Sequence, residues 1–136
     1  MPESAESEGR LPRLKLSLRP TAESIVRGGH PWVYSESIRK QNREGEAGEI
    51  AVIYDRKDKF LALGFFEPDA PLRVRILHVG KPVKVDHVWW EGKLAETLAI
   101  RRALLSESTN GLRLIIGESD GWPGLVMDRY DTTLVL

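Results

Sequence analysis

The sequence predicts an α+β fold that is mainly β, in which a small closed or half-closed β-barrel is followed by a second, partial α+β unit. Short strand-forming runs succeed one another between residues 13 and 77 with one short helical segment among them. A long helical segment and three more strand-like runs come after them. Lys81 and Pro82 break the pattern, so we expect the barrel in residues 11–80 and the second unit in residues 84–136.

The barrel begins with a predicted half-buried strand over residues 13–19. Polar and apolar residues alternate there with a period of two. This alternation places Leu14, Leu16 and Leu18 on one face of the strand and the cations on the other.

A short helix over residues 20–27 and an extended segment are predicted next. The helix begins with Pro20 in its first turn or with Thr21 as its cap, and Gly28-Gly29 stops it. Pro31 then favours an extended chain. The remaining barrel strands are predicted at residues 49–54, 59–66 and 72–77, with a hairpin turn at residues 55–58.

The second unit is predicted to start with a helix that Asp86 caps and that runs to about Leu105. The helix carries an apolar stripe that we expect in the core, made of Trp90, Leu94, Leu98 and Leu105. Asn110-Gly111 is a turn signal. The strands expected after it are residues 112–116, 124–130 and 133–136, joined by the loop 117–123 and by a tight turn at Asp131 and Thr132.

The two ends of the sequence differ in character. The last residues, 133–136, lie in an apolar run that reads as a buried strand, whereas a natural terminus is more often a solvated tail. We therefore expect the front portion of a longer protein. An oligomer or a covering loop is the alternative, so a homodimer stays open. Residues 1–10 are acidic and small, lack the apolar stretch of a signal peptide, and are expected to be a disordered tail.

Composition limits the classes of function. The 136 residues include no cysteine, which excludes disulfides, thiolate metal sites and a cysteine nucleophile within this chain. The longest apolar stretches, such as residues 112–116, are far shorter than the roughly 20 residues of a membrane helix. We expect no membrane association, and a cytoplasmic location fits.

Charge is distributed unevenly although the net charge is zero. From Arg10 to Arg43 the sequence has eight cationic residues and only two carboxylates, and beyond Arg43 the balance turns acidic. A positive segment on a neutral protein attracts phosphate locally, as an RNA-binding module requires. A solvated surface that happens to be basic is the alternative.

The candidate RNA site centres on residues 27–34. Its glycines let the backbone approach a ligand, and its cation, imidazole and aromatic rings suit phosphates and splayed bases. In the alternative, Trp32 and Tyr34 fill the core; we favour the core for Trp32 and the surface for Arg27, His30 and Arg39. The candidate set is Arg19, Arg27, Gly28, Gly29, His30, Trp32, Tyr34, Arg39 and Lys40.

A second group of polar residues lies near the end of the sequence. Glu118, Asp120 and Asp128 could form a magnesium site or an acid/base pair, but loop acids beside glycine and proline more often hold turns. His78 and His87 lack metal-ligand spacing, and we predict no metal site. The chain has no glycine-rich phosphate loop and no dinucleotide fingerprint, so no cofactor is expected in it.

Two stretches resemble one known family. Residues 29–34, 48–55, 60–64 and 72–77 resemble the amino-terminal PUA domain of SAM-dependent 23S ribosomal RNA cytosine-5 methyltransferases. Arg101-Arg102 and residues 113–130 are similar to a motif of the family's next domain, with Trp122 where leucine is usual. The resemblance covers about residues 11–136 and implies a PUA-like barrel with an α+β linker domain.

The resemblance also implies a division of labour. The family's SAM-binding domain and catalytic cysteine would lie beyond Leu136, so this chain alone would not transfer a methyl group, and S-adenosylmethionine is implied for the parent only. The chain would dock large-subunit ribosomal RNA. Residues that would face the substrate channel or have a structural role are Glu118, Asp120, Asp128, Arg129 and Tyr130.

Two other functions remain as alternatives. One is a stand-alone adaptor whose PUA-like barrel binds protein, with the basic strand serving solubility. The other is a small metal-dependent hydrolase that uses Glu118 and Asp120. Salt dependence separates RNA docking from protein binding, because counterion release makes phosphate binding weaken steeply with salt.

Overall fold

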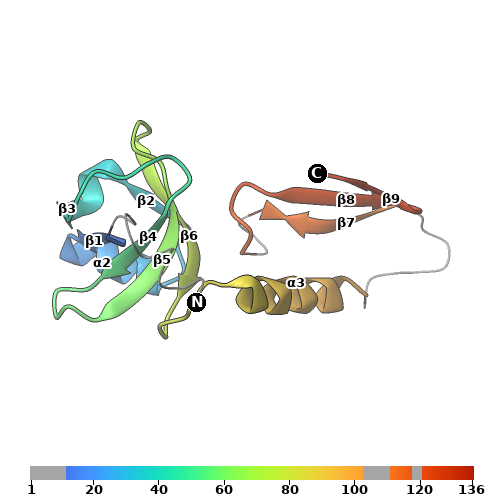
Figure 1. The fold of residues 1–136 in the computed structure, drawn as a ribbon, viewed down its shortest axis with the longest axis horizontal. Coiled ribbons are helices and arrows are strands. Elements are labelled where there is room, and N and C mark those ends of the chain that lie inside the picture. Colours follow the sequence, from blue (N-terminus) through green and yellow to red (C-terminus); the bar gives the residue numbers. More distant parts are fainter. Residues whose placement is uncertain (1–11, 103–110, 118–120) are drawn as a thin grey trace, which may run out of the picture.

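A computed structural model describes residues 12–102, 111–117 and 121–136, which form two β-sheets connected by a long helix (Figure 1). The first sheet has six strands in the order β2-β6-β5-β4-β1-β3, and the second has three in the order β7-β8-β9. The six-stranded sheet curls around a short helix, and the long helix runs along one face of the smaller sheet (Figure 1). The predicted mainly-β, α+β fold is therefore confirmed. The predicted tail at residues 1–10, Leu105 and Asn110 lie outside the described residues.

Strand β1, Leu14–Leu18, forms where the period-two pattern predicted a half-buried strand. Leu14, Leu16 and Leu18 are buried at 0–2% exposure, whereas Lys15 is exposed. The strand pairs in parallel with β4 and antiparallel with β3, so it lies one strand from the edge of the sheet. Its apolar face thus supplies the centre of the barrel core.

Strands β4, Ile50–Tyr54, β5, Phe60–Phe66, and β6, Leu72–Val79, form an antiparallel meander at the predicted positions. The predicted hairpin joins β4 to β5. In its turn Asp58 has a φ of 61°, and Asp55 Oδ1 accepts the backbone N–H groups of Lys57 and Lys59 at 2.8 and 3.0 Å. The short polar side chain of Asp55 thus replaces backbone partners that the turn cannot provide.

Helix α2, Pro20–Arg27, has Pro20 in its first turn, as predicted. Thr21 does not cap it, because Pro20 already begins the helix: the N-cap is Arg19, whose side chain makes no capping hydrogen bond to the helix. Ala22 and Val26 pack into the barrel core. After the helix come β2, Trp32–Tyr34, the 3-10 turn η1, Ser35–Ser37, and β3, Ile38–Gln41.

The second unit contains α3, His87–Arg102, β7, Gly111–Ile116, β8, Val126–Tyr130, and β9, Thr133–Val135. Asp86 caps α3 as predicted, since its Oδ1 accepts the Trp89 N–H at 2.8 Å. The predicted core stripe is only half-buried at Trp90, Leu94 and Leu98; the buried helix residue is Thr97.

The expectation of a buried final strand is wrong in the described structure. Leu134, Val135 and Leu136 are 57%, 50% and 81% exposed. Among the described residues, strand β9 pairs only with β8 and is an edge of its sheet. Leu134 lines the hollow beside α3, but the side chains of this strand stay largely exposed. The hydrophobicity of these residues alone therefore led to a wrong prediction of their burial.

Aromatic rings join the barrel to the second unit. Trp89 and Trp90 of α3 pack against a cluster on the outer face of the barrel that is centred on Val52, Leu63 and Leu77. This contact fixes α3 at the end of β6. None of the helices in the described ranges is long and apolar enough to cross a membrane.

Candidate nucleic-acid interface

The predicted binding segment lies at the turn between α2 and β2. The backbone N–H groups of Gly28 and Gly29 donate to the carbonyl oxygens of Ser24 and Val26, each at 3.0 Å, and so close the end of the helix. Gly29 has a φ of +98°, a conformation that L side chains rarely adopt, and no atom lies within 4 Å of where a Cβ would be. The turn therefore needs glycine for its backbone and leaves open space beside it.

Strand β2 presents its aromatic residues to solvent, because the residue that it buries is Val33, at 2% exposure. Trp32 and Tyr34 are 36% and 41% exposed. The expectation that Trp32 fills the core is therefore wrong: the alternation of β2 places Val33 inward and both flanking aromatics outward.

A hollow of about 150 Å³ lies between α2 and β2. His30 forms part of its wall, with Nδ1 accepting the Trp32 N–H at 3.2 Å and its ring edge-on to Trp32 at a centroid distance of 6.0 Å. The residues that line the hollow are Ala22, Ile25, Val26, His30, Trp32, Val33, Tyr34 and Ser37. The aromatic rings at the rim of this hollow and the apolar residues on its floor offer surfaces on which a base can stack.

Arg27, at the end of α2, is held by two carboxylates. Its Nη2 donates to Asp55 Oδ2 at 2.9 Å, and its Nη1 lies 3.8 Å from Glu23 Oε2. The Glu23 side chain is buried at 2% exposure and also accepts the backbone N–H of Arg56 at 2.9 Å. The pKa of Asp55 lies below its ordinary value, mainly because its carboxylate accepts a hydrogen bond from the backbone N–H of Lys59. The positive charge of Arg27 lowers this pKa further. Much of the positive charge of Arg27 is thus offset within the barrel.

The other predicted cations differ in their surroundings. Arg19 Nε donates to the carbonyl oxygen of Glu36 at 2.9 Å, which positions the η1 turn. Arg39 and Lys40 are exposed on β3, an edge strand, and no ion pair with either of them occurs in the part of the chain that the structure describes. The predicted set is therefore divided between the α2–β2 turn and the β3 edge.

Of the second predicted group, Asp128, Arg129 and Tyr130 lie on β8. Arg113 on β7 donates from Nε to Asp128 Oδ1 at 2.8 Å, and this bond lowers the pKa of Asp128 and raises that of Arg113. Asp128 thus holds two strands together. Tyr130 is 54% exposed. Glu118 and Asp120 lie outside the described residues, and among those described no group of three or more His, Asp or Glu could hold a metal ion.

Arg129 belongs to a different surface. Its Nε donates to the carbonyl oxygen of Asp131 at 2.9 Å, and the side chain lines a hollow of about 360 Å³ between α3 and the small sheet. Arg101 and Arg102 line the same hollow. Of the described motif residues, Asp128 and Arg129 thus make contacts on different surfaces.

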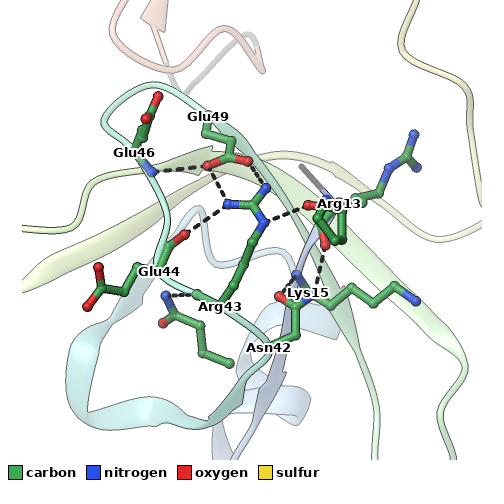
Figure 2. A network of polar contacts seen from close by, with 9 residues as sticks. Arg13, Lys15, Asn42, Arg43, Glu44, Glu46 and Glu49 are labelled. Atoms are coloured by element: carbon green, nitrogen blue, oxygen red, sulfur yellow. Dashed lines mark hydrogen bonds and ion pairs between the residues drawn. The ribbon is translucent and has the colours of Figure 1, made fainter. Parts of the chain in front are cut away.

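A network of polar contacts that was not predicted from the sequence fixes the loop after β3 (Figure 2). Arg43 pairs with Glu49, donates from Nη1 to the carbonyl oxygen of Glu44 at 2.9 Å, and donates from Nε to the carbonyl oxygen of Pro12 at 2.6 Å. Arg43 is the main cause that lowers the pKa of Glu49. An arginine and a glutamate six positions apart in a loop follow no helix or strand period, so only the folded structure shows that Arg43 and Glu49 pair.

Sequence comparison supports the resemblance. A family described as a PUA-like domain matches residues 16–78. The chain is 52% identical over 130 residues to a Deinococcus radiodurans protein named ribosomal RNA large subunit methyltransferase, covering 92% of this chain and 32% of the relative. A protein from Aliivibrio fischeri named ribosomal RNA large subunit methyltransferase I is 34% identical over 114 residues, covering 83% of this chain and 29% of that protein. The chain spans about a third of the length of these curated relatives.

Solved structures share the fold. A chain described as a SAM-dependent methyltransferase from Streptococcus mutans superimposes with a TM-score of 0.70 at 19% identity, covering 88% of this chain and 31% of that one. A second, described as a methyltransferase complexed with SAH, gives a TM-score of 0.71 with the same identity and coverage. The arrangement of barrel, helix and second sheet therefore occurs within larger chains.

Proposed function

We propose that this chain, which belongs to the ribosomal RNA large subunit methyltransferase family, docks ribosomal RNA so that the rest of the parent protein can methylate it. Family membership rests on 52% identity across 130 residues and on the PUA-like match over residues 16–78. The chain spans about a third of its curated relatives, and the activity of the whole protein is part of the proposal.

The observation that carries the proposal is the aromatic hollow beside α2. Trp32 and Tyr34 are exposed although both are large apolar rings, and they flank a hollow next to a glycine turn. Exposed aromatic rings with open backbone beside them suit unstacked bases of single-stranded or looped RNA. We therefore assign the first RNA contact to Trp32, Tyr34 and His30.

Cations around the hollow supply attraction to phosphate. Arg19 donates to the carbonyl oxygen of Glu36 in the η1 turn, and Arg39 lies on β3 just after that turn. Arg27 contributes less, because Asp55 and Glu23 already hold its guanidinium. Stacking on the rings then favours RNA with unpaired bases, while the cations provide an affinity that weakens as salt rises.

The chemistry of methyl transfer is assigned to the rest of the parent. S-adenosylmethionine supplies the methyl group in such enzymes, and we assign its binding to the part of the parent outside this chain. Nucleotide-like cofactors bind at the carboxyl ends of parallel strands in doubly wound sheets, and here only β1 and β4 run parallel, inside a curled sheet. We take residues 11–80 as the docking barrel and 84–136 as a linker domain before the cofactor-binding domain.

A protein-binding adaptor is not favoured. The relatives of this chain are named ribosomal RNA methyltransferases, and exposed aromatic rings (Trp32, Tyr34) and exposed cations (Arg19, Arg39) lie near one another on the barrel. A protein that acts on bacterial ribosomal RNA meets its substrate in the cytoplasm, which is where we expect the parent to act.

Replacing the exposed rings tests the docking site. Trp32→Ala and Tyr34→Ala are each expected to weaken binding of a large-subunit ribosomal RNA fragment by about 1 kcal/mol or more, the usual contribution of a base stacked on an aromatic ring. Thermal unfolding of each variant checks the fold. Val88→Ala, which truncates a 73%-exposed residue on α3, is the control. Unchanged RNA affinity in both ring variants, with unchanged folding, would remove this site.

A further inference from the structure

A groove distinct from the hollow beside α2 lies on the outer face of the barrel, across strands β3, β1 and β4. Its volume is about 270 Å³. Three residues in register form a row across the strands: Lys40 pairs with Ser17, and Ser17 pairs with Tyr54. Because Ser17 is small and half-buried between a long cation and a ring, it forms the floor of the groove.

An irregularity in β3 places Lys40 on this face. Ser17 pairs with Lys40 but the next residue of β1, Leu18, pairs with Ile38, so Arg39 is the extra residue of a bulge. Ile38 packs against the inner core. Without the extra residue, regular alternation would place Lys40 on the same face as Ile38, toward the core. The bulge thus gives the groove its second cation.

Lys15 supplies the first cation of the groove. Its Nζ lies 5.6 Å from the centroid of the Tyr54 ring. Its backbone is fixed by Asn42, whose Oδ1 accepts the Lys15 N–H at 2.8 Å and whose Nδ2 donates to the carbonyl oxygen of Arg13 at 2.9 Å. Figure 2 shows the Lys15 side chain extending away from the Arg43 network while its backbone takes part in it.

The two cations of the groove are not neutralised by ion pairs. Among the described residues, the ammonium groups of Lys15 and Lys40 form no ion pair, whereas Arg27, Arg43 and Arg113 each pair with a carboxylate. A single carboxylate, that of Asp58, lies at the groove. Two ammonium groups beside the Ser17 hydroxyl and the Tyr54 ring attract one phosphate group. The negative charge of Asp58 would repel a second phosphate.

We propose that this groove binds one nucleotide of a single-stranded RNA segment. Its phosphate lies between Lys15 and Lys40 above the Ser17 hydroxyl, and its ribose or base covers the exposed part of the Tyr54 ring. The proposal rests on the proposed function, because it adds a contact on the β3 side of the barrel to the one beside α2. A strand of RNA that reaches both would pass Arg39, which lies on β3 between η1 and Lys40.

The test removes charge without removing side-chain length. Lys15→Gln combined with Lys40→Gln is compared with the wild-type chain for binding of a short oligouridylate, at several salt concentrations. Loss of one phosphate contact is expected to weaken binding about tenfold at low salt and to reduce the slope of log affinity against log salt by about 0.7. Lys15→Arg with Lys40→Arg should restore most of the affinity.

Lys84→Gln is the matched control, since Lys84 is an exposed cation outside both surfaces. If wild type and the Lys84 variant bind alike and the double glutamine variant binds as tightly with the same salt slope, the groove is not an RNA contact, while the α2 site stands. If the wild-type chain binds no RNA, the proposed function fails and this proposal with it. Unfolding curves of the double variant exclude a folding defect.

Discussion

The ring of Phe65 on β5 and the indole of Trp90 on α3 stack with their centroids 6.3 Å apart and their planes 11° from parallel. Trp90 also lies 5.7 Å from Trp122, whose Nε1 donates to Thr97 Oγ1 at 2.8 Å. Barrel, helix and small sheet therefore meet at one aromatic joint. Lys93 lies 5.5 Å from the centroids of both Trp89 and Trp122, and burial lowers its pKa.

Removal of the central ring should loosen this joint. Trp90→Ala is expected to lower the free energy of unfolding by about 2 kcal/mol, less than for a fully buried ring because Trp90 is only half-buried. Urea unfolding followed by circular dichroism measures the change. Val88→Ala on the exposed side of α3 should change stability by no more than about 0.5 kcal/mol. Equal stability of Trp90→Ala and wild type would mean that the joint does not hold the two units.

Close backbone packing at Gly64 gives a second prediction. A Cβ there would lie 2.2 Å from the carbonyl oxygen of Arg75 on β6, so Gly64→Ala must push two paired strands apart. We expect a loss of about 2 kcal/mol or more, in the range of overpacked cores. Gly92→Ala is the contrast: nothing lies within 4 Å of its Cβ position on α3, and alanine should stabilise the helix by about 0.5–1 kcal/mol. Similar effects of both changes would contradict the packing seen at Gly64.

The Arg43–Glu49 pair makes stability depend on pH. Hydrogen bonding to Arg43 lowers the pKa of Glu49 below its ordinary value of 4.5. The folded state therefore favours the carboxylate: the pair stabilises the fold above pH 4.5, and that stabilisation disappears as the pH falls through the lower, folded-state pKa. Glu49→Gln should destabilise the protein at pH 7 and matter much less in strong acid. Urea unfolding of both proteins across this range measures it, and a pH-independent difference would contradict the assignment.

The cations of the docking face should not contribute equally. Arg39 has no ion pair among the described residues, so Arg39→Ala is expected to weaken RNA binding by about 1 kcal/mol without changing stability. Arg27→Ala should affect RNA binding less, because Asp55 and Glu23 already offset its charge. It should instead reduce stability, since it leaves the buried carboxylate of Glu23 with fewer partners. Filter binding and thermal unfolding of both variants distinguish the two roles, and the reverse order of RNA affinities would refute this ranking.

Much of the barrel was predictable because its strands carry strong local signals. The alternation of β1 placed Leu14, Leu16 and Leu18 correctly, and proline and glycine marked both ends of α2. Strand β3 was missed because Ile38 is its one apolar residue and its pairing with β1 depends on the bulge at Arg39. A strand defined by tertiary pairing has little local pattern to detect.

The segment proposed as the candidate site could be picked out in the sequence, but the arrangement of its side chains could not. The segment from Arg27 to Tyr34 does lie at one turn, yet Trp32 faces solvent because β2 buries Val33, and alternation then turns both of its neighbours outward. One partner of Arg27, Asp55, lies 28 positions away in the sequence, which no spacing rule anticipates. Lys15 and Tyr54 were overlooked because each looked like an ordinary strand residue before the register joined them.

The most direct test of RNA docking is binding of a labelled large-subunit ribosomal RNA fragment to the wild-type chain at low and moderate salt, with an unrelated RNA as competitor. We predict binding that weakens steeply as salt rises and that the unrelated RNA displaces only in part, because stacked bases add selectivity to the phosphate contacts. Absence of binding at low salt would contradict the account and would leave this chain with the fold of its family but not the docking role.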